Sequence, residues 1–424
     1  MNRRWPTAIA ALGIAWYASD SLRHRREGGR GYSLDDPQPV DGERFVRAAE
    51  ALTQAPISYG NRVDLLVNGD RIFPAFLEAI AGATRTLNLE TYVYWTGEIA
   101  DRVADALCER ARAGVTCRVL LDAVGAARMN GGLIRQMEEA GVTVRRFRPP
   151  KPYALRRGNN RTHRRVLVAD GRVGMTGGVG IAREWTGNAE DPDHWRDTHV
   201  RVAGPAVRGL QGAFAENWLE ATGEVLTGDD DLPELEPLPD GEAATQVIRS
   251  SAGVGDTNVE TLYYMAIASA ARSIELTSAY FVPRPAFLAA LQDASRRGVR
   301  VSVLVPGRNT DKAFVRHAGR HVYGGLLRAG VRVFEYRPTM LHAKTMCVDG
   351  AWAAVGSANF DNRSFQLNDE VVLCVHDRGF AARLGEVFAE DLAVSDEITL
   401  DAWRRRSLPG RVAELAGRLA RREL

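Results

Sequence analysis

The chain has 424 residues, of which 45% are hydrophobic and 25% are charged, a composition typical of a globular protein with room for two domains of ordinary size. Its 55 lysines and arginines nearly balance 53 acidic residues, so the overall charge gives no reason to expect nucleic-acid binding. The four cysteines form no CxxC pair, which argues against a zinc ribbon or a disulfide framework and favours reduced core residues.

Residues 1–45 are interpreted as an N-terminal apolar anchor and a linker. Arg3 and Arg4 precede an apolar run at about residues 5–18, which is shorter than the ~20 residues that cross a bilayer comfortably. Aromatic residues at both ends of the run favour an uncleaved anchor at the membrane interface. A signal peptide and a short buried helix remain alternatives. We therefore expect a protein at the cell membrane, N-terminally anchored or peripheral.

The chain then repeats itself. An amphipathic helix followed by an apolar strand occurs at 76–95 and again at 263–282, and a helix end, a glycine and a strand follow in both copies, at 109–122 and 137–149 and at 294–306 and 326–338. Helices that alternate with buried strands indicate an α/β fold. The repeat predicts two α/β sandwich halves, residues 46–221 and 246–395, related by a pseudo-twofold axis.

Two further segments flank the second half. Residues 222–245 are rich in acidic residues and proline and have no periodicity, which predicts a linker between the halves. Residues 396–424 form a tail whose end, 411–424, has the pattern of an amphipathic helix. Such a helix could lie on a membrane or pack on its own protein. The sequence leaves the oligomeric state open.

The second half contains a compact motif, "HAKTMCVDG", followed by "WAAVGSAN". Strand alternation places His342 and Lys344 on one face, and Asp349 begins the turn into a returning strand that brings Ser357 and Asn359 beside them. An imidazole, a cation, a hydroxyl and an amide together are the groups that a tetrahedral phosphate needs. This motif therefore predicts phosphodiester chemistry.

The first half contains a related motif, "THRRVLVAD". His163 and Asp170 have the same spacing as in the second motif, but Arg165 stands in the place of the lysine. The returning strand carries only glycines here, among them Gly178, whose backbone can approach a ligand closely. Two histidines suit displacement at phosphorus, because one can attack while the other transfers protons. No cluster of carboxylates is spaced to bind a metal, and no cofactor is expected.

These motifs resemble those of the phospholipase D superfamily, which repeats H-x-K-x4-D followed by G-[SG]-x-N. The stretches "AYFVP" (279–283), "VGSANFDNRSFQLNDE" (355–370) and "WRDTHVRVAGPAV" (195–207) resemble the bacterial cardiolipin synthases more narrowly. The resemblance covers about residues 60–400. Arg165 replaces the lysine of the family pattern, and Gly180 replaces its asparagine.

The resemblance implies an active site at the interface of the two halves, with His163 as nucleophile and His342 as acid and base. It also implies that Asp197 and Glu370, at the positions of the family's histidine-orienting carboxylates, fix the two imidazoles. The expected reaction joins two phosphatidylglycerol molecules into cardiolipin and glycerol. Alternatives are hydrolysis or exchange on another phospholipid, a nuclease, and a non-catalytic lipid-binding homologue with a degenerate first motif.

Residues 145–165 include nine basic residues and no acidic one, with apolar residues among them. A solvated loop is the ordinary interpretation of such a run. Its position beside His163 favours a surface for an anionic substrate, and together with the apolar N-terminus it favours a membrane phospholipid. The expected partners are therefore phosphatidylglycerol and a membrane surface, with no nucleic acid.

Overall fold

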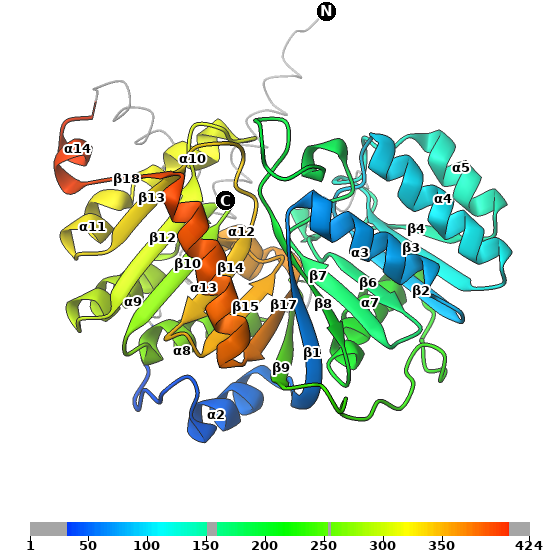
Figure 1. The fold of residues 1–424 in the computed structure, drawn as a ribbon, viewed down its shortest axis with the longest axis horizontal. Coiled ribbons are helices and arrows are strands. Elements are labelled where there is room, and N and C mark those ends of the chain that lie inside the picture. Colours follow the sequence, from blue (N-terminus) through cyan, green and yellow to red (C-terminus); the bar gives the residue numbers. More distant parts are fainter. Residues whose placement is uncertain (1–31, 151–158, 253–255, 407–424) are drawn as a thin grey trace, which may run out of the picture.

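The computed structural model describes residues 32–150, 159–252 and 256–406. Within these ranges, sixteen strands form one sheet with helices on both faces (Figure 1). The apolar run at 5–18, residues 151–158 of the basic stretch and the expected helix at 411–424 lie outside the described residues. Among the described helices, none has the length and apolar character required to span a membrane.

The strands have the following bounds. The first half contains β1 (Ile57–Val67), β2 (Thr86–Thr91), β3 (Thr116–Asp122), β4 (Thr143–Phe147), β5 (Arg161–Thr162), β6 (Val166–Ala169), β7 (Val173–Gly177) and β8 (Thr198–Ala203). The second half contains β9 (Ala243–Ser250), β10 (Ser273–Ser278), β11 (Phe281–Val282), β12 (Arg300–Pro306), β13 (Arg332–Tyr336), β14 (Lys344–Val348), β15 (Trp352–Gly356), β16 (Phe360–Asp361), β17 (Asn368–His376) and β18 (Ser395–Glu397).

The strand order shows the pseudo-twofold symmetry directly. From the centre of the sheet, the first half runs β1-β8-β7-β6-β2-β3-β4 and the second runs β9-β17-β15-β14-β10-β12-β13, with β18 added at its edge. The two series correspond strand for strand, and antiparallel pairing of β1 with β9 joins them. The predicted α/β fold with two related halves is confirmed, and the halves share one continuous sheet.

The helices cover this sheet on both faces (Figure 1). They are α2 (Glu43–Thr53), α3 (Gly69–Ala81), α4 (Glu98–Arg112), α5 (Gly131–Glu139), the 3-10 helix η1 (Arg183–Trp185), α7 (Val207–Thr222), α8 (Asn258–Ser269), α9 (Pro285–Arg296), α10 (Ala313–Arg320), α11 (Tyr323–Arg328), α12 (Asn362–Gln366), α13 (Arg378–Ala393) and α14 (Leu400–Arg404).

Three large apolar clusters form the core. The first packs α3, α4 and α5 on the first half, the second packs α8, α9 and α11 on the second half, and the third joins α7 and α13 to the sheet of both halves. Most of helix α2 lies within the range expected for the first half, but its Phe45 and Ala49 belong to the core of the second half. The four cysteines are free and buried, as predicted.

Each motif aspartate anchors a hairpin. Asp170 and Asp349 have positive φ, as do the glycines that follow them, which gives the tight turn that joins two antiparallel strands. The carboxylate of Asp170 accepts hydrogen bonds from the backbone N–H groups of residues 84–86, and that of Asp349 from residues 271–273. Both aspartates therefore fasten the hairpin to the start of β2 or β10, in line with their expected structural role.

The segment between the halves is held in place by a buried charge. Residues 223–242 contain no helix or strand, yet Asp231 accepts hydrogen bonds from Arg118 Nη1 and Asn88 Nδ2, both at 2.9 Å. Removing one partner of such a buried pair would leave an uncompensated charge. This part of the predicted linker is thus attached to the first half.

Candidate active site

Both motif histidines lie at the carboxyl ends of the parallel strands. His163 precedes β6, whose Val166 pairs with Glu90 near the end of β2. His342 precedes β14, whose Lys344 pairs with Ser278 at the end of β10. Open α/β sheets commonly bind ligands at this edge, because the loops that follow the strands meet there.

The two halves hold each other's histidine. The backbone N–H of His163 donates to Asp369 O at 2.8 Å, and the backbone N–H of His342 donates to Arg196 O at 2.7 Å. Short parallel pairings accompany these bonds, β5 with β17 and Leu341 with Arg196. Each histidine segment therefore lies against the segment of the other half that carries a motif carboxylate.

The side chain of each histidine also contacts a carboxylate of the other half. His163 Nδ1 lies 3.0 Å and 3.1 Å from the two carboxylate oxygens of Glu370, and His342 Nδ1 lies 2.7 Å from Asp197 Oδ2. Both carboxylates are almost completely buried. The structure brings Asp197 and Glu370 to the histidines, as expected, and pairs each acid with the histidine of the opposite half. The sequence analysis did not specify that exchange.

These contacts determine the tautomers. A carboxylate beside Nδ1 favours a proton on that nitrogen and leaves the lone pair on Nε2. Burial, reinforced by Arg165, lowers the pKa of His163 to about 4, and burial, reinforced by Lys344, lowers the pKa of His342 to about 3. Burial raises the pKa of Asp197, but the neighbouring His342 outweighs it, and that pKa lies well below its ordinary value. Without substrate, these shifts favour the neutral form of both imidazoles at neutral pH.

A cation lies beside each Nε2 atom. Arg165 donates from Nη1 to the carbonyl of its own His163 at 2.7 Å and places Nη2 3.0 Å from His163 Nε2. Lys344 donates to the carbonyl of His342, and its Nζ lies 3.0 Å from Nδ1 and 3.1 Å from Nε2 of the His342 ring. Both cations are buried, so Arg165 faces the site and not solvent. Burial lowers the pKa of Lys344 to about 7.

The returning strands support the carboxylates. The Ser357 hydroxyl donates to Glu370 Oε2 and accepts from Val371 N at 3.0 Å. At Gly178, an added Cβ would lie 2.1 Å from Asp197 Oδ1. Asn359 is buried, and its backbone N–H donates to Ser364 Oγ at 3.0 Å. Direct contact of Ser357, Asn359 and Gly178 with phosphate stays a prediction. The observed side-chain contact of Ser357 is to Glu370, and the backbone N–H of Gly178 donates to Thr198 O at 3.1 Å.

Aromatic rings surround the histidines. The Tyr92 ring lies 5.2 Å from that of His163, and the rings of Trp185 and Trp195 lie 5.1 Å and 5.7 Å from that of His342. The sequence analysis missed these residues. Trp195 opens the "WRDTHV" segment and Trp185 precedes it, but no spacing rule indicated that either would meet a histidine so far along the chain.

Several arginines of the basic stretch at 145–165 are paired with acidic residues in the part of the stretch that the structure describes. Arg161 binds Asp122 at 2.8 Å, Arg164 binds Glu216 at 3.0 Å, and Arg148 binds Glu220 at 2.6 Å. The prediction of a substrate-facing basic surface is wrong for these three arginines, because their charges are already matched by acidic partners. Arg165, in contrast, has a buried Nε without a hydrogen-bond partner in the described residues, and this donor is available for an anion.

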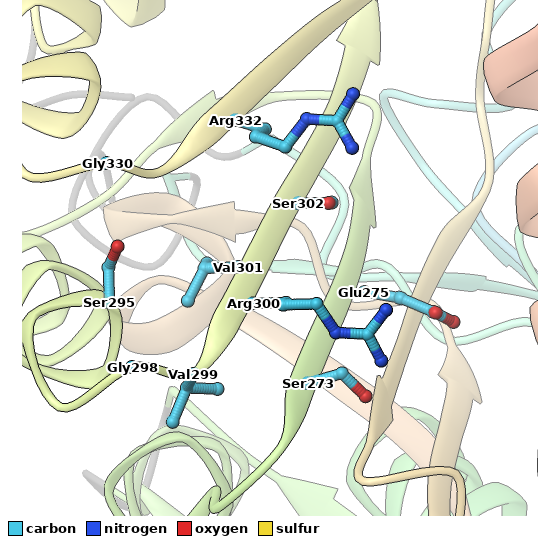
Figure 2. Close-up of a pocket in the computed structure, with 10 residues that line it drawn as sticks. All are labelled: Ser273, Glu275, Ser295, Gly298, Val299, Arg300, Val301, Ser302, Gly330 and Arg332. Carbon is cyan, nitrogen blue, oxygen red and sulfur yellow. The ribbon is translucent and has the colours of Figure 1, made fainter.

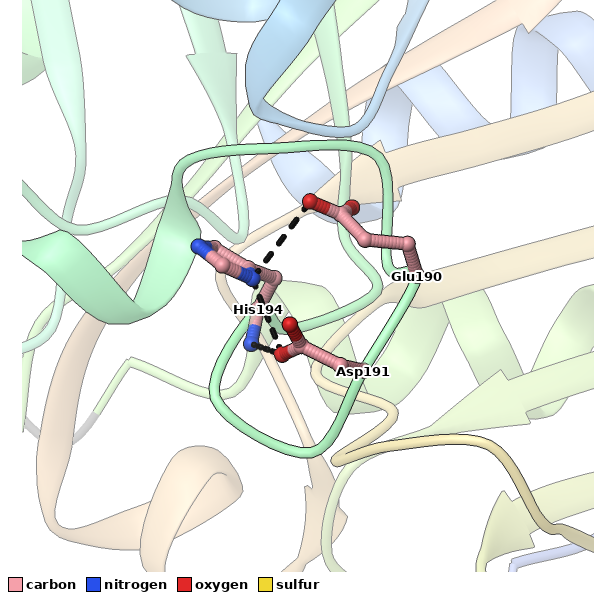
Figure 3. Close-up of side chains that lie close together, drawn as sticks. All are labelled: Glu190, Asp191 and His194. Atoms are coloured by element: carbon pink, nitrogen blue, oxygen red, sulfur yellow. Dashed lines mark hydrogen bonds and ion pairs between the residues drawn. The ribbon is translucent and has the colours of Figure 1, made fainter.

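Two other features lie apart from the histidines. Glu190, Asp191 and His194 could in principle hold a metal ion, and Figure 3 shows that they face one another on one loop. His194 Nδ1 lies 2.9 Å from Asp191 Oδ1 and 3.4 Å from Glu190 Oε1. These acids are exposed, unlike those of the histidine site, and their contacts with His194 account for the cluster.

A groove of about 320 Å³ lies on the second half. Its lining includes Ser273 and Arg300 (Figure 2), the first residues of β10 and β12. The groove is therefore at the amino ends of the parallel strands, the edge opposite the histidines. It does not belong to the candidate active site.

Comparisons with known proteins identify the family of the chain. A family model described as "Cardiolipin synthase, PLD-like domain" matches residues 76–197 and 263–392, one match in each half. The cardiolipin synthase of Geobacillus sp. (strain WCH70) is 35% identical over 396 residues, which cover 93% of this chain and 78% of the relative. Cardiolipin synthase 2 of Bacillus anthracis is 34% identical over 381 residues, 89% of this chain and 73% of the relative.

The chain belongs to the phospholipase D-like cardiolipin synthase family. Its fold is also that of a solved phosphatidylserine synthase from Haemophilus influenzae, with a TM-score of 0.68, 13% sequence identity and coverage of 89% of this chain and 99% of that one. The resemblance drawn from the two motifs is confirmed, despite Arg165 and Gly180.

Proposed function

We propose that the protein transfers a phosphatidyl group from one phosphatidylglycerol molecule to another, forming cardiolipin and glycerol. The observation that carries this proposal is the pair of buried histidines, each held between a carboxylate and a cation. Each has Nδ1 bound to a carboxylate of the other half and Nε2 beside a cation. Cardiolipin synthase relatives at about 35% identity support the same reaction.

The reaction divides into two displacements. His342 takes up a proton on Nε2 when the anionic phosphodiester binds. His163 Nε2 then attacks the phosphorus of the first phosphatidylglycerol, and the P–O bond to glycerol breaks as His342 gives this proton to the leaving oxygen. A hydroxyl of the second phosphatidylglycerol then loses its proton to His342 and attacks the phosphohistidine, which breaks the P–N bond and restores His163. One phosphodiester replaces another, so atoms and charges balance without a nucleotide or another co-reactant.

The site has the charges that these steps need. Arg165 and Lys344 balance Asp197 and Glu370, so a phosphodiester adds one negative charge to a neutral group of residues. That charge raises the pKa of His342 and Lys344 toward their protonated forms, which a proton donor and an oxyanion partner require. The two cations can also stabilise the extra negative charge of the pentavalent transition state.

We place the protein at the cell membrane because both substrates are lipids. An N-terminal anchor at residues 5–18 and peripheral attachment are both consistent with this location. The two tryptophans beside His342 give it an apolar setting. Such a setting disfavours water as the competing acceptor and favours transfer over hydrolysis.

The test is to incubate the purified protein with phosphatidylglycerol vesicles and to analyse lipids by mass spectrometry. We expect cardiolipin and glycerol in equal amounts. Acid-labile phosphate should be trapped on His163, and His163→Ala should abolish both product and label. Phosphatidic acid as the main product would make the protein a hydrolase, and wild-type rates in His163→Ala would identify the first motif as degenerate. A label on His342 would reverse the two roles.

A further inference from the structure

We propose that Trp185 is a positioning residue for the proton-transferring histidine: its indole N–H holds Asp197, and through it His342, as the Ser357 hydroxyl holds Glu370 and His163. This inference rests on the proposed function. It assigns a role to a residue outside the two histidine motifs.

Trp185 contacts both members of the acid–histidine pair. Its Nε1–H donates to Asp197 Oδ2 at 2.8 Å, and the same oxygen lies 2.7 Å from His342 Nδ1. The indole ring also meets the imidazole edge to face, with ring centres 5.1 Å apart at 85°. Trp185 is 1% exposed. A hydrogen bond to a buried carboxylate is strong and directional, so this donor restricts the orientation of the carboxylate.

The second half achieves the same result with a hydroxyl. Ser357 donates to Glu370 Oε2, an oxygen that lies 3.1 Å from His163 Nδ1. The corresponding residue of the first half is Gly178, which has no side chain to donate. An added Cβ there would lie 2.1 Å from Asp197 Oδ1, so serine does not fit without a shift of the acid. The indole supplies the missing donor from a position seven residues later in the chain.

Val93, together with the indole, restricts the residue at position 180. The corresponding residue of the second half is Asn359, yet an added Cβ at Gly180 would lie 2.8 Å from Val93 Cβ and 3.1 Å from Trp185 Cζ3. Real Cβ atoms almost never approach a branched carbon so closely. Asparagine at 180 is therefore incompatible with Trp185 and Val93 in their observed positions. Val93 makes the closest approach and Trp185 adds a second tight contact, so the two side chains together favour glycine at this position.

Neighbouring rings fix the indole. Trp195 lies 4.5 Å from Trp185 and Trp95 lies 5.9 Å from it, between ring centres. Trp95 belongs to the same cluster but donates its own N–H elsewhere, to Gly125 O at 2.7 Å. It therefore offers a matched control, a tryptophan with a satisfied N–H that contacts neither Asp197 nor His342 in the structure.

The experiment compares two substrates that differ in their need for a proton donor. Phosphatidylglycerol has a poor leaving group, whereas phosphatidyl-p-nitrophenol releases a stable anion and needs little help from an acid. For Trp185→Phe we expect kcat with phosphatidylglycerol to fall on the order of 10- to 100-fold, the effect of losing one charge-assisted hydrogen bond. KM should change little, and the first burst of p-nitrophenol should keep its wild-type rate.

Two further variants complete the comparison. Ser357→Ala should slow both substrates, because it disturbs the nucleophile, and Trp95→Phe should slow neither. If Trp185→Phe does not fold, benzothienylalanine at 185 keeps the ring shape and removes only the N–H. Equal slowing of both substrates by the 185 variants, or no slowing, would overturn the inference. If the wild-type protein makes no cardiolipin, the proposed function fails. The role of Trp185 can still be tested, by comparing the p-nitrophenol burst with the rate on a substrate that releases glycerol.

Discussion

The two histidine motifs reach the same contact geometry with different residues. In both, a cation touches the carbonyl and Nε2 of its own histidine, a carboxylate of the other half binds Nδ1, and a further donor holds that carboxylate. The cation is Arg165 in one half and Lys344 in the other, and the donor is Trp185 in one and Ser357 in the other. The two halves therefore repeat these contacts but make them with different residues.

This difference has a chemical consequence at the cations. Burial lowers the pKa of Lys344 to about 7, so its charge depends on pH and on the bound substrate. Burial also lowers the pKa of Arg165, but a guanidinium begins from a much higher value and presents several donors in a plane. The first half therefore has a permanent cation and the second a titrating one.

The largest expected effect comes from breaking the exchanged acid–histidine pairs. Asp197→Asn and Glu370→Gln should each lower the rate of cardiolipin formation on the order of 10³-fold or more, because an amide favours the wrong imidazole tautomer. Asp197→Asn should retain the p-nitrophenol burst and Glu370→Gln should lose it. The opposite pattern would show that the halves do not exchange their acids, or that the histidine roles are reversed.

Removal of the first cation should have the next largest effect. Arg165→Ala should cost on the order of 10²-fold in rate, as loss of a transition-state charge contact does. Arg165→Lys should retain substantial activity, since the second half uses lysine in the same contacts. Rates are compared at equal folded concentration, checked by thermal melting. Full activity in Arg165→Ala would mean that Lys344 alone supplies the required charge.

Because Lys344 can lose its proton, we expect a smaller effect on rate that depends on pH. In the free enzyme Lys344 loses its proton as pH rises through about 7, so kcat/KM for phosphatidylglycerol should fall on the alkaline side. Lys344→Arg should keep its charge there and move that limb to higher pH. The measurement is kcat/KM from pH 5 to 9 for both proteins, since this ratio reports ionisations of the free enzyme. If the alkaline fall in kcat/KM does not move in Lys344→Arg, a group other than Lys344 causes it.

The hairpin anchors should affect stability and leave the chemistry intact. Asp170→Ala and Asp349→Ala each remove the acceptor of three backbone N–H groups, which should lower the free energy of unfolding by about 1–3 kcal/mol. Urea unfolding gives this value for both variants. If both variants lose a similar free energy of unfolding and form cardiolipin at near-normal rates at low temperature, the two halves use these aspartates in the same way.

Much of the fold and of the candidate site could be predicted from local sequence patterns. The repeated helix, glycine and strand units were correct, because apolar periodicity reflects burial within one element. Gly114 and Gly298, for example, follow α4 and α9 with φ of 92° and 93°, a conformation that favours glycine at a helix end. The histidine, cation and aspartate spacings were also local, since each motif occupies one hairpin.

The basic stretch at 145–165 shows where prediction from local sequence patterns fails. Arg148 and Arg161 resemble a surface patch in sequence, but their partners Glu220 and Asp122 come from other elements. A run of like charges in sequence says nothing about the acidic groups that folding brings against it. Burial and pairing of charges are properties of the assembled sheet.

By itself, the sequence determined the two related halves, the two histidine motifs and the family to which they belong, because these depend on residues close together in the chain. Only the tertiary structure decided that Glu370 serves His163, that Asp197 serves His342, and that Trp185 replaces a hydroxyl. Each of the two acid–histidine pairs joins residues more than 140 positions apart. A symmetric repeat leaves two pairings open, and only the packing of one half against the other selects between them.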